Sequence, residues 1–263
     1  HQRIIYDLMM RCSWDTLKTF SRNDQRLQGQ PGTAAVLHTH SRQLDYHPHV
    51  HVVMPAGAID PKRRLWRSKQ GKGKKSFLFS HKALAKVFRA KMLEAVRVSG
   101  LRLPERYPDH WVVDCQSVGS GEKALIYLGR YLYRGVIQEK DIVSVQDGKV
   151  TFRYTDSKTK QARLRTVPAA TFLWLLMQHV LPKGFRRARN FGFLHPNSKR
   201  LIQLLHYLFN LNPAHALAVF ADKNQRPTIV CPCCGAEMKI IRTRIYPTLK
   251  GKPKEGVMDP LAM

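Results

Sequence analysis

The stretch Tyr46-His47-Pro48-His49-Val50-His51-Val52-Val53-Met54-Pro55 decides the fold. Its three β-branched valines and the prolines around them predict a β-strand. Because successive side chains of a strand point to opposite faces, His49 and His51 project from the same face, two residues apart. Two imidazoles side by side on a strand make half of a divalent-metal site.

Histidines are concentrated around this strand, because five of the 12 in the chain lie between residues 38 and 51. A single His-x-His pair is a common pattern. Taken alone, it favours an edge strand whose imidazoles are solvated or hydrogen-bonded. Residues further along the chain shift the interpretation toward a metal site.

A second strand is predicted immediately before the first, at residues 34–40. The connection is short, so the two strands are expected to pair antiparallel around residue 44 or 45. In that register His38 lies opposite His51, which brings a third imidazole within reach of the pair. His38 is therefore the preferred third ligand, and His40 and Gln43 are the alternatives.

Charge is the strongest global signal, since 45 Lys and Arg against 18 Asp and Glu give a formal net charge of +27. A folded chain tolerates such self-repulsion poorly unless its partner is a polyanion, so nucleic acid is the first candidate. An acidic membrane surface is the second. No basic amphipathic helix supports it and no apolar run is long enough to cross a bilayer, so we expect no membrane partner.

The five cysteines are an odd number in a chain that opens without a secretory signal. This usage indicates a reducing, cytoplasmic compartment rather than a disulfide scaffold. The first residue is His rather than Met, so we expect the chain to be a piece of a longer protein.

Basic residues spaced by glycines fill residues 60–76. One interpretation is an arm that grips phosphates while an indole stacks on a base, and the alternative is a solvated β-ribbon. A run of one charge sign favours the arm. The candidate DNA-binding residues here are Lys62, Arg63, Arg64, Trp66, Lys72, Lys74 and Lys75. A second, compact basic cluster contributes Arg186 and Arg187.

The remaining chain mixes helices and strands. Apolar spacing predicts helices at residues 4–20, 80–100 and 122–136, and two more that begin at 168 and 197. Runs of β-branched residues predict a strand at 111–115, a hairpin at 141–156 and a further strand at 162–167. This mixture predicts an α+β fold.

The predicted helix at residues 122–136 carries Tyr127 and Tyr131 one turn apart, so both hydroxyls emerge from one face. Arg130 and Arg134 lie on or beside that face. Taken alone, this pattern more often reflects aromatic side chains that pack into a core with their hydroxyls hydrogen-bonded.

Four blocks of sequence occur in a recognisable order. They are Leu37-His38-Thr39, His47-Pro48-His49-Val50-His51, Tyr127-Leu128-Gly129-Arg130-Tyr131 and His179-Val180-Leu181-Pro182-Lys183-Gly184-Phe185-Arg186-Arg187. Together they resemble the two-tyrosine HUH transposases, which move certain bacterial insertion sequences by a rolling-circle route. The resemblance extends over residues 4–246, and no single block would suffice.

The resemblance implies catalytic roles for Tyr127 and Tyr131, and a metal site for Mg²⁺ or Mn²⁺ at His49, His51 and His38. One tyrosine attacks a phosphate of single-stranded DNA at the element ends and becomes a 5′-phosphotyrosine, which leaves a free 3′-hydroxyl. The second tyrosine lets one site hold a strand end while it cleaves another. Arg130 and Arg134 are placed to neutralise phosphate. An all-imidazole site by itself would suit zinc or another transition metal, so the identity of the ion stays open.

A cysteine motif follows, because Cys231 and Cys234 have the Cys-x-x-Cys-Gly pattern of half a zinc knuckle. A structural zinc site needs four ligands, and no second pair follows. Binding of Zn²⁺ is therefore the less favoured interpretation of this motif.

The resemblance implies a central antiparallel sheet with helices packed on one face, followed by a helical C-terminal part and a basic tail. We expect an HUH endonuclease core at residues 1–160, a helical and basic extension at 161–230, and a cysteine knuckle with a disordered basic tail at 231–263. The predicted protein is a nucleoid-associated rolling-circle transposase of the bacterial cytoplasm. The alternatives are a plasmid rolling-circle replication initiator or relaxase, and a non-catalytic DNA-binding relic. The sequence does not indicate an oligomeric state.

Overall fold

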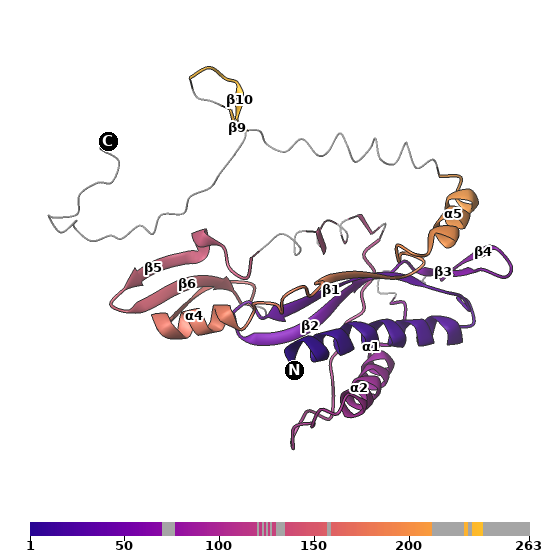
Figure 1. The fold of residues 1–263 in the computed structure, drawn as a ribbon, viewed down its shortest axis with the longest axis horizontal. Coiled ribbons are helices and arrows are strands. Elements are labelled where there is room, and N and C mark those ends of the chain that lie inside the picture. The colour runs from indigo at the N-terminus through magenta and orange to yellow at the C-terminus, as the bar shows by residue number, and fades with distance from the viewer. Residues whose placement is uncertain are drawn as a thin grey trace. The chain divides into compact units, whose positions relative to one another are not determined.

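The computed structural model describes residues 1–69, 77–119, 121–122, 124, 126, 128–129, 135–156, 159–211, 229–230 and 233–238. The chain divides into two compact units, His1–Leu211 and Asn212–Met263. The fold is α+β with antiparallel sheets, as predicted (Figure 1). The predicted functional division at residues 160 and 230 stays a prediction. In the second unit, β9 (Ile229–Val230) pairs antiparallel with β10 (Glu237–Met238).

The central sheet contains the histidine strand. It consists of β2 (Tyr46–Val53), β1 (Gly32–His40) and β8 (Ala188–Gly192) in the order β2-β1-β8, and both pairings are antiparallel. The long helix α1 (Gln2–Asn23) runs along this sheet (Figure 1). Both the predicted first helix and the predicted pair of strands are therefore confirmed.

Alternation along β1 separates a helix-covered face from a histidine face. Tyr6 and Met10 of α1 pack against Ala35 and Leu37, and all four side chains are at most 2% exposed. Burying a large apolar side chain contributes about 1.5–3 kcal/mol, so this contact fixes which face of the sheet α1 covers. Residues of the other parity, including His38, consequently project from the face opposite α1.

The second helix, α2 (His81–Val98), packs against α1 rather than against the sheet. Four buried side chains form that contact: Leu8, Cys12, Met92 and Val96. Ser80 is the N-cap residue, as predicted, although its side chain makes no capping hydrogen bond. None of the described helices combines the length and the apolar composition required to cross a bilayer.

A second sheet is formed by β5 (Ile142–Gln146), β6 (Lys149–Thr155) and β7 (Ala162–Pro168) in sequential order. The predicted hairpin is confirmed, with Asp147 and Gly148 at its turn. Both have positive φ, 49° and 70°, which is typical of the two-residue turns that match strand twist. The short 3₁₀ helix η1 (Glu139–Asp141) precedes the hairpin.

Helix α4 (Ala169–Met177) follows β7 and packs against the second sheet, where the two form a hydrophobic core. Phe172 and Leu175 pack with Val150 and Phe152 of β6, and all four are less than 9% exposed. The fifth buried member of the cluster is Leu44, from the connection between β1 and β2. The histidine hairpin is thereby attached to the second sheet through its turn.

The predicted basic arm is in part a β-ribbon, because β3 (Gly57–Asp60) pairs antiparallel with β4 (Leu65–Ser68). Trp66 is half-buried, and its ring lies 5.7 Å from that of Phe193 and 5.4 Å from that of Phe209, between centroids. Phe209 directly follows α5 (Lys199–Leu208). For residues 57–68 the structure therefore matches the alternative interpretation of a ribbon.

Two other segments differ from expectation. Residues 111–115 are not a strand, and among the described residues nothing pairs with them. Trp111 and Val113 pack into different hydrophobic clusters, so the segment runs over the helices without a ladder. Strand β8 was not expected, because the arginines before it indicated only a basic cluster.

Gly192, at the end of β8, is a position where only glycine fits. Its φ is +64°, and a Cβ there would overlap the carbonyl oxygen of Pro31 and lie 2.7 Å from the ring of Trp14. We expect Gly192→Ala to lower the free energy of unfolding by about 2–3 kcal/mol, because both strain and overlap must be relieved.

Denaturant unfolding monitored by circular dichroism measures this effect. Gly148→Ala is the matched control, because its φ is +70° but no atom lies within 4 Å of the added Cβ. That change should cost only about 1 kcal/mol. Equal losses for the two variants would contradict the proposed overlap.

Candidate metal centre

Three histidines converge on the open face of the central sheet. His38 comes from β1, and His49 and His51 come from β2; one ligand atom from each lies within 4.8 Å of the others. The ring centroids are 4.4 Å apart for His38 and His51, 4.9 Å for His49 and His51, and 5.3 Å for His38 and His49. We call these residues the histidine triad.

The spacing within the triad fits the coordination of a metal ion. The two Nε2 atoms of His49 and His51 are 3.2 Å apart. Two nitrogens that each lie about 2.1 Å from an ion, at octahedral or tetrahedral angles, are separated by roughly 3.0–3.4 Å. The pair on β2 is therefore arranged as two adjacent ligands.

The orientation of His49 is fixed by a backbone contact. Its Nδ1 lies 2.7 Å from the carbonyl oxygen of His47, which can only accept a hydrogen bond. The proton is therefore on Nδ1, and the lone pair of Nε2 is directed to the triad. Histidine ligands of metals are commonly held in this way.

Burial keeps the triad neutral. His38 is 3% exposed, and burial, followed by the nearby His51 ring, lowers its pKa to about 3. Burial also lowers the pKa of His49 and of His51. Imidazole binds a cation only in its neutral form, so these shifts favour metal binding at neutral pH.

The predicted register of the hairpin is wrong by two residues. His38 pairs with His49 rather than with His51, and a β-bulge separates His38 from His40, which pairs with Tyr46. A bulge inserts an unpaired residue and re-aims the neighbouring side chains. His38 still reaches both rings of β2 because its ring spans the gap diagonally to His51.

The two alternative third ligands lie elsewhere. His40 stacks on His38 at 6.0 Å between centroids, and its other neighbour is His179 at 5.4 Å. Gln43 lies in the turn, where its carbonyl oxygen accepts a hydrogen bond from Arg165. Neither is part of the cluster of potential ligands found among the described residues.

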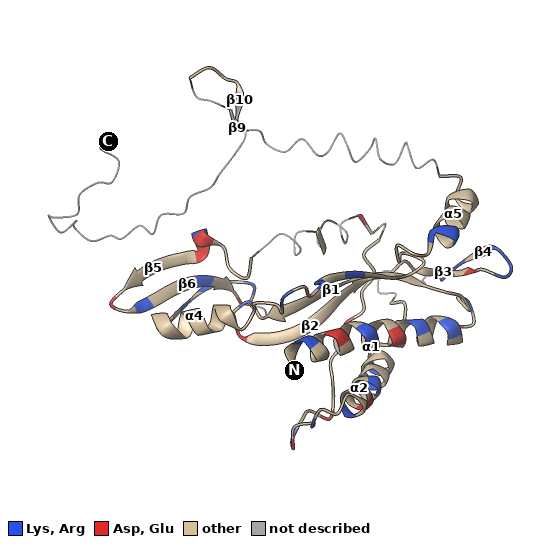
Figure 2. Ribbon diagram, in the orientation of Figure 1, with Lys and Arg blue, Asp and Glu red and all other residues tan. Residues whose placement is uncertain are grey.

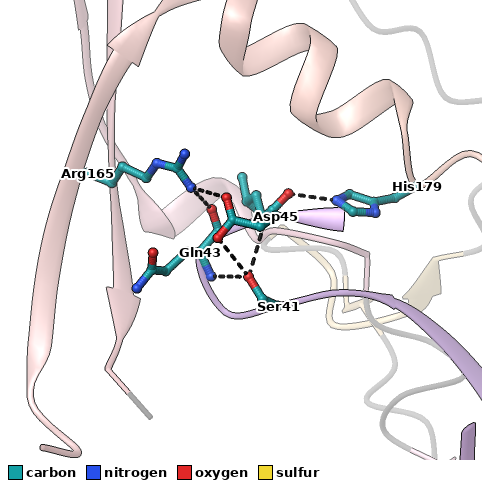
Figure 3. A network of polar contacts seen from close by, with 6 residues as sticks. Ser41, Gln43, Asp45, Arg165 and His179 are labelled. Atoms are coloured by element: carbon teal, nitrogen blue, oxygen red, sulfur yellow. Dashed lines mark hydrogen bonds and ion pairs between the residues drawn. The ribbon is translucent and has the colours of Figure 1, made fainter. Parts of the chain in front are cut away.

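The turn between β1 and β2 is held by polar contacts at both ends (Figure 3). The hydroxyl oxygen of Ser41 accepts hydrogen bonds from the backbone N–H groups of Gln43 and Asp45, both at 3.1 Å. Arg165 of β7 donates to the Gln43 carbonyl and, at 2.8 Å, to the Asp45 carboxylate. The second sheet thus holds in place the turn that connects the two strands of the triad.

The segment after α4 makes a second contact with this turn, through His179. His179 is 6% exposed, and its Nε2 donates to the carbonyl oxygen of Leu44 at 2.9 Å. Leu44 itself has a positive φ of 69° and is 2% exposed. A branched residue in that conformation is held by its surroundings rather than by local preference. No local sequence signal indicates Arg165, whereas His179 stands in the fourth recognised block.

The predicted nucleophiles Tyr127 and Tyr131, with Arg130 and Arg134, lie outside the described residues. The described positions around them, residues 122, 124, 126, 128 and 129, are helical, in agreement with the predicted helix.

The described basic candidates occupy two places. Lys62, Arg63 and Arg64 are exposed at the turn between β3 and β4, where basic residues are visible in Figure 2. Arg186 is exposed, whereas Arg187 is half-buried and its Nε donates to the Leu37 carbonyl at 3.2 Å. Three further candidates lie outside the described residues: Lys72, Lys74 and Lys75. Contacts of all these residues with DNA stay predictions.

The cysteine motif is described only in part. Cys234 and its neighbour Cys233 are exposed free thiols, and Cys231 lies outside the described residues. Zinc binding at Cys231 and Cys234 therefore stays a prediction.

Comparisons with known proteins place the chain among transposases. The family model Y2_Tnp, described as "Putative transposase", matches residues 32–201. A "Putative transposase y4qJ" of Sinorhizobium fredii (strain NBRC 101917 / NGR234) is 29% identical over 97% of this chain and 71% of its own length. The "Transposase for insertion sequence element IS801" of Pseudomonas savastanoi pv. phaseolicola is 27% identical over 74% of this chain and 50% of its own length. No solved structure gives a significant match.

Proposed function

The chain belongs to the Y2_Tnp family of transposases, and on that premise we propose that it nicks and rejoins single-stranded DNA at the ends of a mobile element. The histidine triad is the observation that carries this proposal, because one ring nitrogen from each of three neutral imidazoles lies within 4.8 Å of the other two. We infer that the reaction belongs to rolling-circle transposition and uses the HUH endonuclease chemistry.

The proposed step transfers a phosphoryl group to a tyrosine. The hydroxyl oxygen of Tyr127 or Tyr131 bonds to phosphorus while the bond to the 3′ oxygen breaks. The phenol proton goes to the departing 3′ oxygen, which leaves a 5′-phosphotyrosine and a 3′-hydroxyl. The new phosphodiester keeps the energy needed for rejoining, so no nucleotide cofactor is required.

A divalent ion is proposed because tyrosine needs help at neutral pH. A phenol has a pKa of about 10 and is a weak nucleophile at neutral pH. An ion in the triad supplies charge that polarises the scissile phosphate and offsets its developing negative charge. His38, His49 and His51 would hold it, and His49 is already oriented for that role by the His47 carbonyl. We propose Mg²⁺ or Mn²⁺ from the family resemblance, although nitrogen ligands by themselves prefer softer ions.

Binding of the strand is assigned to cationic side chains. The net charge of +27 favours a polyanionic partner, and a DNA partner follows from the family. We propose that Lys62, Arg63 and Arg64 contact phosphates from the turn of the β-ribbon. We assign Arg130 and Arg134 to the phosphate near the tyrosines.

The test is the formation of a covalent adduct. The protein is incubated with labelled single-stranded oligonucleotides from element ends and Mn²⁺, and the products are separated on a denaturing gel. We expect an adduct that a chelator removes and that Tyr127→Phe reduces several-fold, because Tyr131 remains. Tyr207→Phe is the matched control, since that tyrosine is 82% exposed on α5 and distant in sequence from the recognised blocks.

Each outcome separates the alternatives. DNA binding without any adduct, whichever divalent ion is added, would contradict the proposal and favour a non-catalytic relic. Cleavage of a plasmid replication origin but not of an element end would favour the replication initiator or relaxase.

A further inference from the structure

A small cavity lies beside the histidine triad, at the point where β8 stops pairing with β1. Its volume is about 70 Å³, and its polar lining consists of Thr39, His40, His179 and Arg187. The apolar lining comes from Leu37, Val136 and Leu181, and Gly135 completes it. None of these eight residues is acidic, so among the described lining residues the one permanent charge is the guanidinium of Arg187.

Arg187 is built into the wall rather than free at the surface. Its carbonyl oxygen accepts a hydrogen bond from the Leu37 N–H at 3.0 Å, and its Nε donates to the Leu37 carbonyl at 3.2 Å. Among the described residues, its two terminal nitrogens have no hydrogen-bond or ion-pair partner. A half-buried cation without a counter-charge is costly, and an anion in the cavity would offset that cost.

His179 provides a second polar group. Its Nε2 is engaged with the Leu44 carbonyl, whereas its Nδ1 is buried and has no hydrogen-bond partner within the described part of the chain. A buried polar atom of this kind calls for a partner, because leaving it unpaired costs about 1–3 kcal/mol. Because Nε2 carries the ring proton, Nδ1 is a hydrogen-bond acceptor, and a water molecule or a protonated phosphate oxygen in the cavity would supply the donor it lacks.

The size of the cavity selects the class of anion. A cavity needs about 10–15 Å³ for each water molecule, so one of about 70 Å³ accommodates a group of roughly five heavy atoms. That matches a phosphate group and is too small for a nucleobase with its sugar. Guanidinium is also the side chain best suited to phosphate, because it offers two parallel N–H donors.

We propose that this cavity binds a phosphate group of the DNA strand adjacent to the phosphate held at the histidine triad. His40 links the two sites, since it lines the cavity and stacks on His38 at 6.0 Å between ring centroids. The part played by the cavity on DNA rests on the proposed function, whereas its affinity for phosphate does not. A second anchored phosphate would fix the direction of the strand and the position of the scissile bond.

The affinity is tested with inorganic phosphate as the probe. The full chain is titrated at constant ionic strength, and the ring ¹⁵N resonances of His179 are followed by NMR. We expect a saturable shift, and we expect Arg187→Gln to weaken the binding at least about tenfold, the loss of one charge-assisted pair. Arg163→Gln removes the same charge from an exposed position on β7 and should leave the affinity unchanged.

The titration of wild-type protein tests the proposal even if Arg187→Gln fails to fold. A His179 resonance that does not shift, or that shifts without saturation, overturns the proposal. An unchanged affinity in folded Arg187→Gln also overturns it. Arg187→Lys should bind phosphate with intermediate affinity, because it keeps the charge but not the two-pronged donor.

The role on DNA is tested with oligonucleotides that carry one neutral methylphosphonate at successive positions, in the presence of a chelator. We expect one position beside the scissile phosphate where neutralisation weakens binding of wild-type protein about tenfold but has no further effect on Arg187→Gln. If an adduct forms but no such position exists, the proposed function stands and the binding of a DNA phosphate in the cavity is refuted. Saturable phosphate binding without any adduct would support the phosphate site in the cavity and contradict the proposed nicking function.

Discussion

Replacing His49 with alanine is expected to lower metal-dependent adduct formation by about 10³-fold while leaving the affinity for single-stranded DNA nearly unchanged. The reason is geometric. His49 Nε2 lies 3.2 Å from His51 Nε2 and is oriented by a hydrogen bond from its Nδ1 to the His47 carbonyl. Removing this ring opens the triad, and an ion that stabilises charge on the phosphate by several kcal/mol is lost or displaced.

The measurement has two parts. Rates of adduct formation are compared on denaturing gels at saturating Mn²⁺, and the affinity for Mn²⁺ is measured by calorimetry without DNA. His38→Ala and His51→Ala should behave like His49→Ala. Combining two of the changes should cost little more than one, because the three ligands act as a unit.

His47→Ala is the matched control for this series. The His47 side chain is exposed, and its ring lies 5.3 Å from that of His49 between centroids. The hydrogen bond that orients His49 is accepted by the His47 backbone carbonyl, which alanine retains. The adduct rate of His47→Ala should stay within about threefold of wild type, since the exposed His47 ring does not belong to the cluster of potential ligands. Equal losses for His47→Ala and His49→Ala would mean that general positive charge, rather than the triad, supports the reaction.

Part of this site could be predicted from the sequence, because it depends on local rules. Alternation along a strand places His49 and His51 on one face whatever the rest of the chain does. Apolar periodicity likewise predicted α1 and α2, and runs of β-branched residues predicted the β5–β6 hairpin, whose contacts are close in sequence. These elements are the ones where local preference and tertiary structure agree.

The rest could not be predicted, because contacts distant in sequence decide it. The register of the hairpin depends on a bulge after His38 and on Leu44, whose buried side chain and positive φ are supported by Arg165 and His179. Those partners are more than a hundred residues away from the turn in sequence, so no local pattern indicates them. Strand β8 was not predicted for the same reason, since its strand partner within the described part of the chain is β1, about 150 residues earlier.

Acid is expected to destabilise the metal-free protein strongly, by about 2–5 kcal/mol between pH 6.5 and roughly pH 4.5. Burial lowers the pKa of His38 to about 3 and that of His40 to about 4, against 6.5 in their ordinary state. Between these values the unfolded chain binds protons that the folded chain excludes. The contribution of these two histidines to stability is therefore fully present above pH 6.5 and is lost as the pH falls toward their folded-state pKa values.

The size of the effect follows from proton linkage. Each histidine that stays neutral in the folded state contributes a slope of about 1.4 kcal/mol per pH unit below its unfolded pKa. His38 is 3% exposed and should give nearly the full slope, whereas the partly exposed His40 gives less. Asp24 and Asp60, whose pKa values lie below their ordinary 3.8, lose their contribution only at lower pH.

Urea unfolding at a series of pH values, with a chelator present, measures this slope. His38→Phe keeps a ring at the position but removes one titrating group, so its slope should be smaller by about one proton. Adding Mn²⁺ should raise stability most at neutral pH, since protons and the ion compete for the same nitrogens. If His38→Phe retained the full slope of the wild type, the acid sensitivity would originate from groups other than His38, and the buried neutral state of His38 would have to be abandoned.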